Sequence, residues 1–310
     1  MEINYLTYQQ INKQKWDACI DKAPNGLIYA YSFYLDTMAK NWDALVLYTG
    51  TNAGDDYETV MPLTWNKKYG IHYLYQPAFT ACLGVFGKSV TAEIIGAFLK
   101  AIPAKFKYWD IYFNPGNIYK ITDFDLYERM NYVLNLSDGY DKLYKAYRDN
   151  IKRNIKKSEE FKLTSNKNIA IDIVIKLARE QAAGFSSMND ADFNNFENLF
   201  QILYKNKKAT TYGVYTKEAS LIAAAVFFFS HKRAYYIMVG NHPNGKTLGA
   251  SHALINAFIK DHAGEDILLD FEGSDVSSLA FFYSSFGAVQ EKYSAVKLNR
   301  LPVYLKWMKR

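Results

Sequence analysis

The sequence is poor in the residues that interrupt or cross-link a polypeptide. It contains 7 prolines and 2 cysteines among 310 residues, and 49% of its residues are hydrophobic. This composition excludes a disordered chain and indicates well-packed globular structure. Cys19 and Cys82 lie far apart, and the 5 histidines have no HExxH or C-x-x-C companion, so we expect reduced thiols and no metal cofactor.

Long hydrophobic runs are also lacking. The longest extends over nine residues, from Leu221 to Phe229, whereas a membrane-spanning helix needs about 20. The N-terminus, MEINYLTYQQ, has no charged segment followed by an apolar one, which is the pattern of a secretion signal. We therefore expect a cytoplasmic protein without membrane insertion.

The chain does contain a small excess of positive charge and many aromatic residues. Its formal net charge is +6, which favours an anionic ligand but is too small for a dedicated nucleic-acid binder. The 26 tyrosines and 20 phenylalanines are typical of polar-tipped pockets or carbohydrate surfaces, and codon bias explains them equally well.

The order of the predicted elements repeats once along the chain. Residues 58–75 and 220–239 each predict two strands joined by a short basic turn. A helix and then a strand with a polar end follow in each half, at 90–101 and 108–116 and again at 247–262 and 266–274. The sequence therefore predicts an α/β (mixed α+β) protein with two tandem domains, 1–137 and 138–310, each a mixed, mostly antiparallel sheet flanked by helices.

A basic helix is predicted over residues 139–159, at the start of the second domain. Helical spacing places its cations on one broad face, namely Lys142, Lys145, Arg148, Lys152, Arg153, Lys156 and Lys157. The opposite stripe is apolar and consists of Leu143, Tyr147, Ile151 and Ile155. The basic face is either a solvated surface or a phosphate-binding edge for tRNA or a nucleotide-linked precursor.

The stretch from Gly240 to Thr247 matches G-x-x-x-x-G-K-T, the phosphate-binding P-loop. The strand before it belongs to a predicted antiparallel hairpin, however, which disfavours a nucleotide hydrolase. A glycine-containing loop at a helix N-terminus can also hold a pyrophosphate through its backbone amides. The candidate donor-binding residues are therefore Asn244, Gly245, Lys246, Thr247, Leu248, Gly249 and Ala250.

The second half resembles the GNAT superfamily of N-acyltransferases in the order of its elements. That order is strand, two helices, three antiparallel strands, helix, strand, helix and two strands. The segment KTLGAS at 246–251 is the nearest match to the GNAT signature R/Q-x-x-G-x-G/A. The tandem arrangement more closely resembles the Fem-type peptidyltransferases. Three stretches carry that likeness: YQPAFTACLGVF at 75–86, YKAYRDNIKRNIKKS at 144–158 and LLDFEGSDVSSLAFFYSSFGA at 268–288.

This resemblance implies an N-acyl- or aminoacyltransferase. The donor would be acyl-CoA or aminoacyl-tRNA, and the acceptor a small-molecule or peptide-like amine such as a peptidoglycan precursor. The second domain would bind the donor and carry the chemistry, and the first would bind the acceptor.

Three residues are candidates for catalysis. Glu272 lies at the polar end of a predicted strand, where a carboxylate can accept the proton that an attacking ammonium must lose. Asp270 precedes it by two residues and is expected on the same face of the strand, either as a second acid or as a residue that positions Glu272. Tyr283 stands where the resemblance to GNAT enzymes implies a proton donor for the leaving group, although a core position in an aromatic stripe is equally natural.

The expected substrate-binding residues lie in both halves, and they are Gln76, Phe79, Asn114, Arg153, Lys157 and Tyr236. Asn114 occupies the place in the first half that Glu272 holds in the second, and an asparagine cannot act as a base. Two other functions stay open: a non-catalytic ligand-binding protein that retains the fold, and a P-loop-type nucleotide-binding protein.

Overall fold

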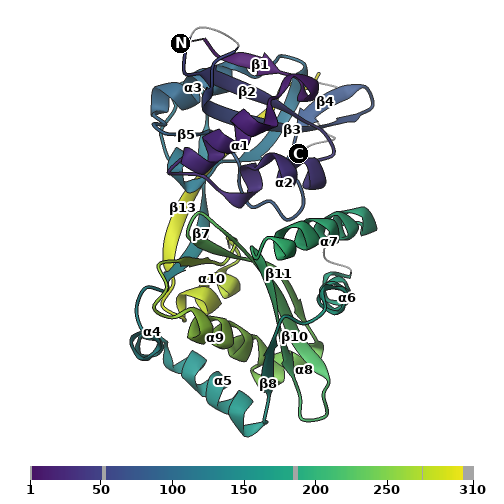
Figure 1. Ribbon diagram of the computed structural model, residues 1–310, viewed down its shortest axis with the longest axis vertical. Helices are drawn as coiled ribbons and strands as arrows, with labels where there is room; N and C mark the ends of the chain where they lie inside the picture. Colours follow the sequence, from purple (N-terminus) through teal and green to yellow (C-terminus); the bar gives the residue numbers. More distant parts are fainter. Residues whose placement is uncertain (1, 51–53, 184–187, 274, 303–310) are drawn as a thin grey trace. The chain divides into compact units, whose positions relative to one another are not determined.

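A computed structural model describes residues 2–50, 54–183, 188–273 and 275–302, except for the side chain of Lys246. The chain folds into two compact units (Figure 1). Unit 1 contains the residues up to Arg129 together with those from Lys292 onward, and unit 2 is Met130–Glu291. The division predicted at residue 137 therefore falls inside unit 2, and the last strand returns to unit 1.

Unit 1 is built on a sheet with the strand order β1, β2, β3, β4, β6, β13, while the short β5 pairs with β3. Its strands are β1 (Asn4–Leu6), β2 (Trp42–Tyr48), β3 (Tyr57–Lys68), β4 (Ile71–Leu74), β5 (Phe86–Gly87), β6 (Phe106–Tyr112) and the later part of β13 (Val289–Asn299). Its helices are η1 (Tyr8–Gln10), α1 (Lys13–Lys22), η2 (Ile28–Ala30), α2 (Ser32–Met38), α3 (Ala92–Ala101) and η3 (Pro115–Asn117).

Unit 2 is built on a sheet with the strand order β7, β12, β11, β10, β9, β8. Its strands are the later part of β7 (Leu126–Asn135), β8 (Thr164–Lys167), β9 (Ala209–Tyr215), β10 (Leu221–Ser230), β11 (Arg233–Asn241) and β12 (Leu268–Asp270). Its helices are α4 (Tyr140–Ala146), α5 (Asp149–Glu160), α6 (Ile171–Ala182), α7 (Asp190–Lys205), α8 (Pro243–Leu248), α9 (Ala250–His262) and α10 (Ser277–Ser284).

The predicted repeat is present in both units. A hairpin, β3–β4 or β10–β11, is followed by helix and then by a strand that pairs in parallel with the second hairpin strand, β6 with β4 and β12 with β11. The turns have positive φ at both central positions, with values of 51° and 81° at Tyr69 and Gly70 and of 50° and 53° at His231 and Lys232. Such turns match the twist of the strands that they join.

In each half of the sequence, the strand that follows the parallel pair joins the sheet of the other unit. Strand β7 follows β6 in the chain, yet it pairs antiparallel with β12, where Val133 lies opposite Asp270. Strand β13 follows α10, yet it pairs antiparallel with β6, where Ala295 lies opposite Tyr112. Each parallel pair is thus completed by a strand exchanged between the two halves of the sequence.

Aromatic side chains fix the main helix of unit 2 on its sheet. The rings of Phe227 on β10 and Phe258 on α9 stack with their centroids 3.8 Å apart, and both side chains are fully buried. Burial of one phenylalanine stabilises a fold by about 1.5–3 kcal/mol. This packing holds α9 at a defined position on β10 and β9.

The predicted basic helix is two helices. Its apolar stripe of Leu143, Tyr147, Ile151 and Ile155 is buried as predicted. The helix is broken because Tyr147 and Arg148 are extended, and the Arg148 N–H donates to the carbonyl of Ser285 at 2.9 Å instead of to the preceding turn. Across the described ranges, no helix combines the length and the apolar character that crossing a membrane requires.

Candidate active site

The candidate active site lies in unit 2, where strands β11 and β12 stop pairing. They pair only through Arg233, Ala234 and Tyr235, which lie opposite Leu268–Asp270. Strand β12 ends there, whereas β11 continues to Asn241 and pairs over that length with β10 alone among the described strands. The backbone groups on the other edge of β11 between Tyr236 and Gly240 are therefore available to an extended ligand, whereas the Asn241 N–H donates to Gln181 Oε1 at 2.6 Å.

A turn with unusual backbone geometry carries Glu272 past the end of β12. Glu272 has a φ of 65° and Gly273 a φ of 88°, and the left-handed region is rare for a residue with a side chain. Glu272 therefore does not continue the alternation of β12, and the prediction that it shares a strand face with Asp270 is wrong. The turn is held by two bonds: Glu272 N–H donates to Asp270 Oδ1 at 2.8 Å, and Gly273 N–H donates to Asn131 Oδ1 at 2.6 Å.

A buried ion-pair network holds Asp270 in turn. Arg233 donates to Asp270 Oδ2 at 2.7 Å and to both carboxylate oxygens of Glu291 at 2.8 Å each. Asn131 Nδ2 donates to Asp270 Oδ1 at 2.9 Å. Burial lowers the pKa of Arg233, but the Glu291 hydrogen bond and the Asp270 charge outweigh it and raise that pKa above its usual value. Asp270 thus positions the turn that carries Glu272.

Two buried tyrosines complete the site. Tyr283 on α10 stacks on Phe271 with 4.5 Å between ring centroids, and Phe271 meets Tyr236 of β11 edge-on at 6.1 Å. Burial and then the negative charge of Glu272 raise the pKa of Tyr283 to about 12. Burial, with Tyr283 as a further cause, raises the pKa of Tyr236 well above its usual value.

The hydroxyls of these tyrosines are available to a ligand. Neither Tyr236 nor Tyr283 has a hydrogen-bond partner for its hydroxyl among the described residues. A buried tyrosine usually finds one, so the arrangement is typical of a binding or reaction site. The structure therefore brings together three residues that the sequence singled out, Tyr236, Glu272 and Tyr283.

The segment predicted as a phosphate-binding loop is mostly helical. Asn244, Gly245, Lys246, Thr247 and Leu248 lie in the short helix α8, which begins at Pro243 behind an N-cap at His242. Helix α9 begins at Ala250 and not near Thr247. The P-loop interpretation is wrong, because the backbone here closes helical turns instead of forming an open loop.

The two glycines of this segment lie against protein backbone. A Cβ on Gly245 would stand 2.5 Å from the carbonyl oxygen of Ile222, and one on Gly249 would stand 2.5 Å from that of Asn154 on α5. Gly249 also has a φ of 76°, which only glycine adopts without strain. Close packing against β10 and α5 thus accounts for both glycines.

A half-buried histidine that the sequence did not single out, His252, lies in the first turn of α9. The ring of His252 meets Phe282 edge-on at 5.0 Å between centroids. Burial lowers the pKa of His252 to about 4, so the imidazole is neutral at pH 7 and can both donate and accept a hydrogen bond. Its position beside α10 places a second proton-transfer group next to the helix that carries Tyr283.

This histidine makes the protein sensitive to acid. The pKa of His252 is 6.5 without the fold and about 4 within it, so its contribution to stability is complete above pH 6.5 and is lost as the pH falls through 4. At about 1.36 kcal/mol for each pH unit of that difference, the loss is about 3 kcal/mol. Urea unfolding at pH 7 and pH 4 should show the wild type losing about that much more than His252→Phe. Equal losses in the two proteins would contradict the assignment.

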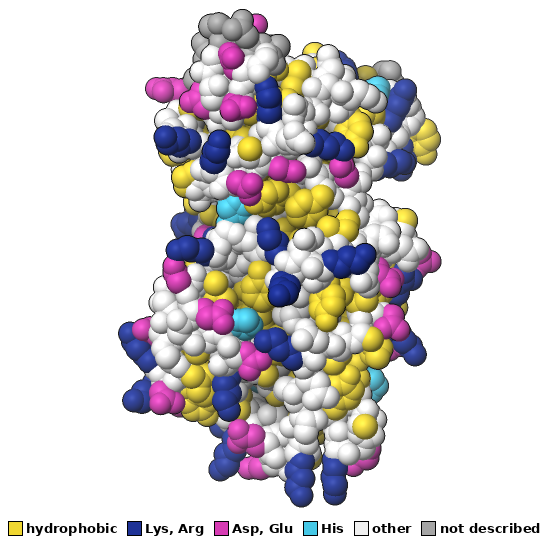
Figure 2. Space-filling view, in the orientation of Figure 1, with side chains coloured by type: hydrophobic (Ala, Val, Ile, Leu, Met, Phe, Trp, Pro, Cys, Tyr) yellow, Lys and Arg dark blue, Asp and Glu magenta, His cyan; other side chains and the backbone are white. Residues whose placement is uncertain are grey.

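Arg153 and Lys157 lie on α5 on either side of Asn154, whose carbonyl faces Gly249. Arg153 is exposed and Lys157 half-buried, and neither forms an ion pair with any residue that the structure describes. On the face shown in Figure 2, Lys and Arg side chains are dispersed among acidic and neutral ones.

In unit 1, Gln76 and Phe79 lie in the segment that follows β4. The side chain of Gln76 donates to the carbonyl of Thr80 at 3.0 Å, and it accepts from the Tyr112 N–H at 3.3 Å. Phe79 has a φ of 53°, and its carbonyl accepts a hydrogen bond from the Tyr34 hydroxyl. Through these bonds, both residues hold the conformation of the segment that follows β4.

Asn114 follows the end of β6 by two residues, just as Glu272 follows the end of β12, so the predicted correspondence is correct in position. Its side chain, however, is fully buried and donates to the carbonyls of Leu83 and Val85 at 3.0 Å each. The expected contact with an acceptor is therefore wrong, because this amide is used to hold the loop.

Sequence reasoning also missed Arg233, Asn131 and Glu291, which hold the Glu272 turn. The one signal present was the HKR turn before β11, which contains Arg233. Asn131 and Glu291 lie 160 positions apart in the chain, and no local pattern connects them.

No family model and no curated protein matches the chain. Solved structures share its fold. FemX covers 100% of both chains with a TM-score of 0.64 at 13% identity. A conserved protein of unknown function from Bacteroides thetaiotaomicron covers 95% of this chain and 100% of that one, with a TM-score of 0.57 at 12% identity.

L-PGS from Bacillus licheniformis matches 81% of this chain and 84% of its own, with a TM-score of 0.51 at 9% identity. These likenesses confirm the predicted fold class, a tandem of two GNAT-like domains. The arrangement is that of FemX, over the whole length of both chains.

Proposed function

We propose that the protein is an aminoacyl- or N-acyltransferase that acylates an amine, with its chemistry at the end of β12. One observation carries the proposal: Glu272 is held in a left-handed turn beside Tyr283, and the Tyr283 hydroxyl has no hydrogen-bond partner in the described part of the chain. A carboxylate and a protonated phenol side by side supply the base and the acid that acyl transfer to an amine requires.

The proposed reaction is direct attack of the amine on the acyl carbonyl. The new C–N bond forms while the bond from the carbonyl carbon to the donor oxygen or sulfur breaks. Glu272 accepts the proton that the amine loses, directly or through one water. Tyr283, whose pKa of about 12 keeps it protonated at neutral pH, donates a proton to the leaving atom. Solvent then returns a proton from Glu272 to Tyr283.

The unpaired edge of β11 could pair with the amide groups of an acyl-CoA donor, which an aminoacyl-tRNA lacks. Two other observations favour aminoacyl-tRNA, and we give them more weight. The segment before α9 is helical and its glycines are packed against backbone, which disfavours a pyrophosphate held by loop amides. Arg153 and Lys157 offer cations for a phosphate backbone instead. We propose a peptide-like amine such as a peptidoglycan precursor as the acceptor, bound by unit 1.

Thermal shift at low salt tests the donor. A ligand at about 100 times its dissociation constant stabilises a fold by about 2.7 kcal/mol. We expect stabilisation by aminoacyl-tRNA that weakens as salt is added, and none by Mg-ATP. Arg153→Ala with Lys157→Ala should reduce the slope of log affinity against log salt by about 2.

The matched control replaces two exposed lysines elsewhere, Lys88 and Lys217, with alanine, and it should leave the slope unchanged. Stabilisation by acetyl-CoA alone would transfer the proposal to a thioester donor. A folded protein that responds to neither donor would contradict the transferase proposal and favour the non-catalytic alternative.

A further inference from the structure

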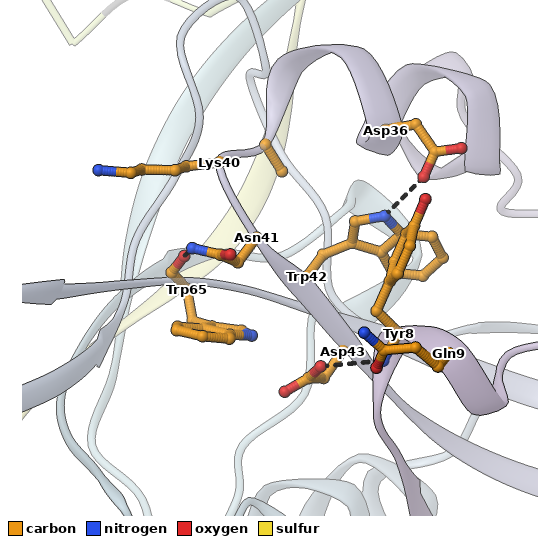
Figure 3. Close-up of a pocket in the computed structure, with 9 residues that line it drawn as sticks. Tyr8, Gln9, Asp36, Lys40, Asn41, Trp42, Asp43 and Trp65 are labelled. Carbon is orange, nitrogen blue, oxygen red and sulfur yellow. Dashed lines mark hydrogen bonds between the residues drawn. The ribbon is translucent and has the colours of Figure 1, made fainter.

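A pocket that contains no residue of the candidate active site lies within unit 1. It has a volume of about 280 Å³ and is bounded by η1, the end of α2, and strands β2 and β3 (Figure 3). Its lining residues are Tyr8, Gln9, Asp36, Ala39, Lys40, Asn41, Trp42, Asp43 and Trp65. This mixture of aromatic rings, amides and carboxylates provides both flat surfaces and hydrogen-bonding groups.

The charges of the pocket are balanced within the protein. Asp36 accepts from Lys13 at 2.6 Å and from the Trp42 indole at 3.0 Å. Asp43 lies 3.5 Å from the ammonium of Lys105. Since each carboxylate has its own cation, the pocket has no excess negative charge that would select a cationic ligand.

Trp65 provides the open wall of the pocket. The side chain of Trp42 is only 2% exposed, whereas that of Trp65 is half-buried and leaves part of its ring accessible. The buried Trp65 Nε1 has no hydrogen-bond partner among the described residues. A buried indole N–H without a partner is uncommon and calls for an acceptor.

The gap is the part of the pocket between Trp65 on one side and Tyr8 and Gln9 on the other. The groups around the gap suit a ligand that both donates and accepts hydrogen bonds. In Figure 3, Asp43 lies between Trp65 on one side and Tyr8 and Gln9 on the other, and the Lys40 side chain points away from them. A hydroxyl entering this gap would accept from Trp65 Nε1 and donate to Asp43. The amide of Gln9 can do both.

We propose that this pocket binds a single neutral sugar ring, stacked on Trp65 and held through its hydroxyls by Asp43 and Gln9. A volume of about 280 Å³ lies just below the range of about 300–1,000 Å³ for pockets of drug-sized ligands, which suits one ring. The proposal does not depend on the transferase function, because every lining residue belongs to unit 1.

The test is to titrate the protein with glucose, galactose and N-acetylglucosamine. Tryptophan fluorescence and saturation-transfer NMR measure the binding. We expect saturable binding of at least one sugar with a dissociation constant on the order of millimolar. Trp65→Phe keeps a ring but removes the N–H, and Gln9→Ala removes the exposed amide. Each should weaken binding about fivefold, and circular dichroism should show that both proteins are folded.

Lys88→Ala is the matched control, since Lys88 is an exposed lysine of unit 1 outside the pocket lining, and its sugar affinity should equal that of the wild type. Three results would overturn the proposal. They are no saturable signal with any of the three sugars, equal affinity in the wild type and in both Trp65→Phe and Gln9→Ala, or preferential binding of an amine probe such as putrescine.

Discussion

Replacing Glu272 with glutamine is expected to lower the turnover rate by roughly 100-fold to 10,000-fold, the usual range for loss of general acid–base catalysis. Glutamine has the same shape and can make the same backbone bond to Asp270, but it cannot accept a proton at neutral pH. The Michaelis constants for donor and acceptor should change little, because the lost interaction is needed in the transition state and not for binding.

The matched control is Glu159→Gln, which removes an exposed carboxylate from α5 and should leave turnover unchanged. Single-turnover kinetics with the donor established by thermal shift measures the effect. An unchanged rate in Glu272→Gln would remove Glu272 from the reaction, and the neutral imidazole of His252 would become the next candidate base.

Replacing Arg233 with leucine is expected to lower the free energy of unfolding by about 3–5 kcal/mol. The substitution leaves Asp270 and Glu291 close together without their shared cation, at side-chain exposures of 7% and 20%. Two carboxylates in such surroundings repel each other and resist ionisation. Urea denaturation at pH 7 measures the loss.

Two further measurements separate this cause from simple loss of packing. Arg233→Lys keeps a charge but cannot bind Glu291 through two parallel bonds, so its loss should be intermediate. The deficit of Arg233→Leu should also shrink as the pH is lowered and the carboxylates protonate. A deficit that does not depend on pH would contradict the electrostatic explanation.

Local patterns account for the parts of the fold that the sequence predicted well. The hairpin before α8 was predictable because the basic turn at His231 and Lys232 separates two strongly apolar strands. The buried stripe that includes Ile151 and Ile155 follows from helical spacing. Even the start of α8 had a local signal at Pro243, since proline is favoured at the first position of a helix, although the match to a phosphate-loop pattern favoured a loop there.

The errors arose where distant parts of the chain decide the structure. No glycine or proline marks the break at Tyr147; it depends on the bond from Arg148 to Ser285, which lies far along the sequence. The role of Asn114 could not be predicted, because its burial depends on carbonyls of another segment. The positioning of Glu272 depends on Asn131 and Glu291, which meet only in the folded chain.

The exchange of β7 and β13 has a consequence for biosynthesis. A ribosome delivers β6 long before β13, so a nascent chain that holds most of unit 1 still lacks the strand that covers β6. An uncovered strand edge is prone to pair with other chains. The ribosome must therefore release the residues up to β13 before the first unit can close its sheet, so unit 1 is completed only after all of unit 2 has been synthesised.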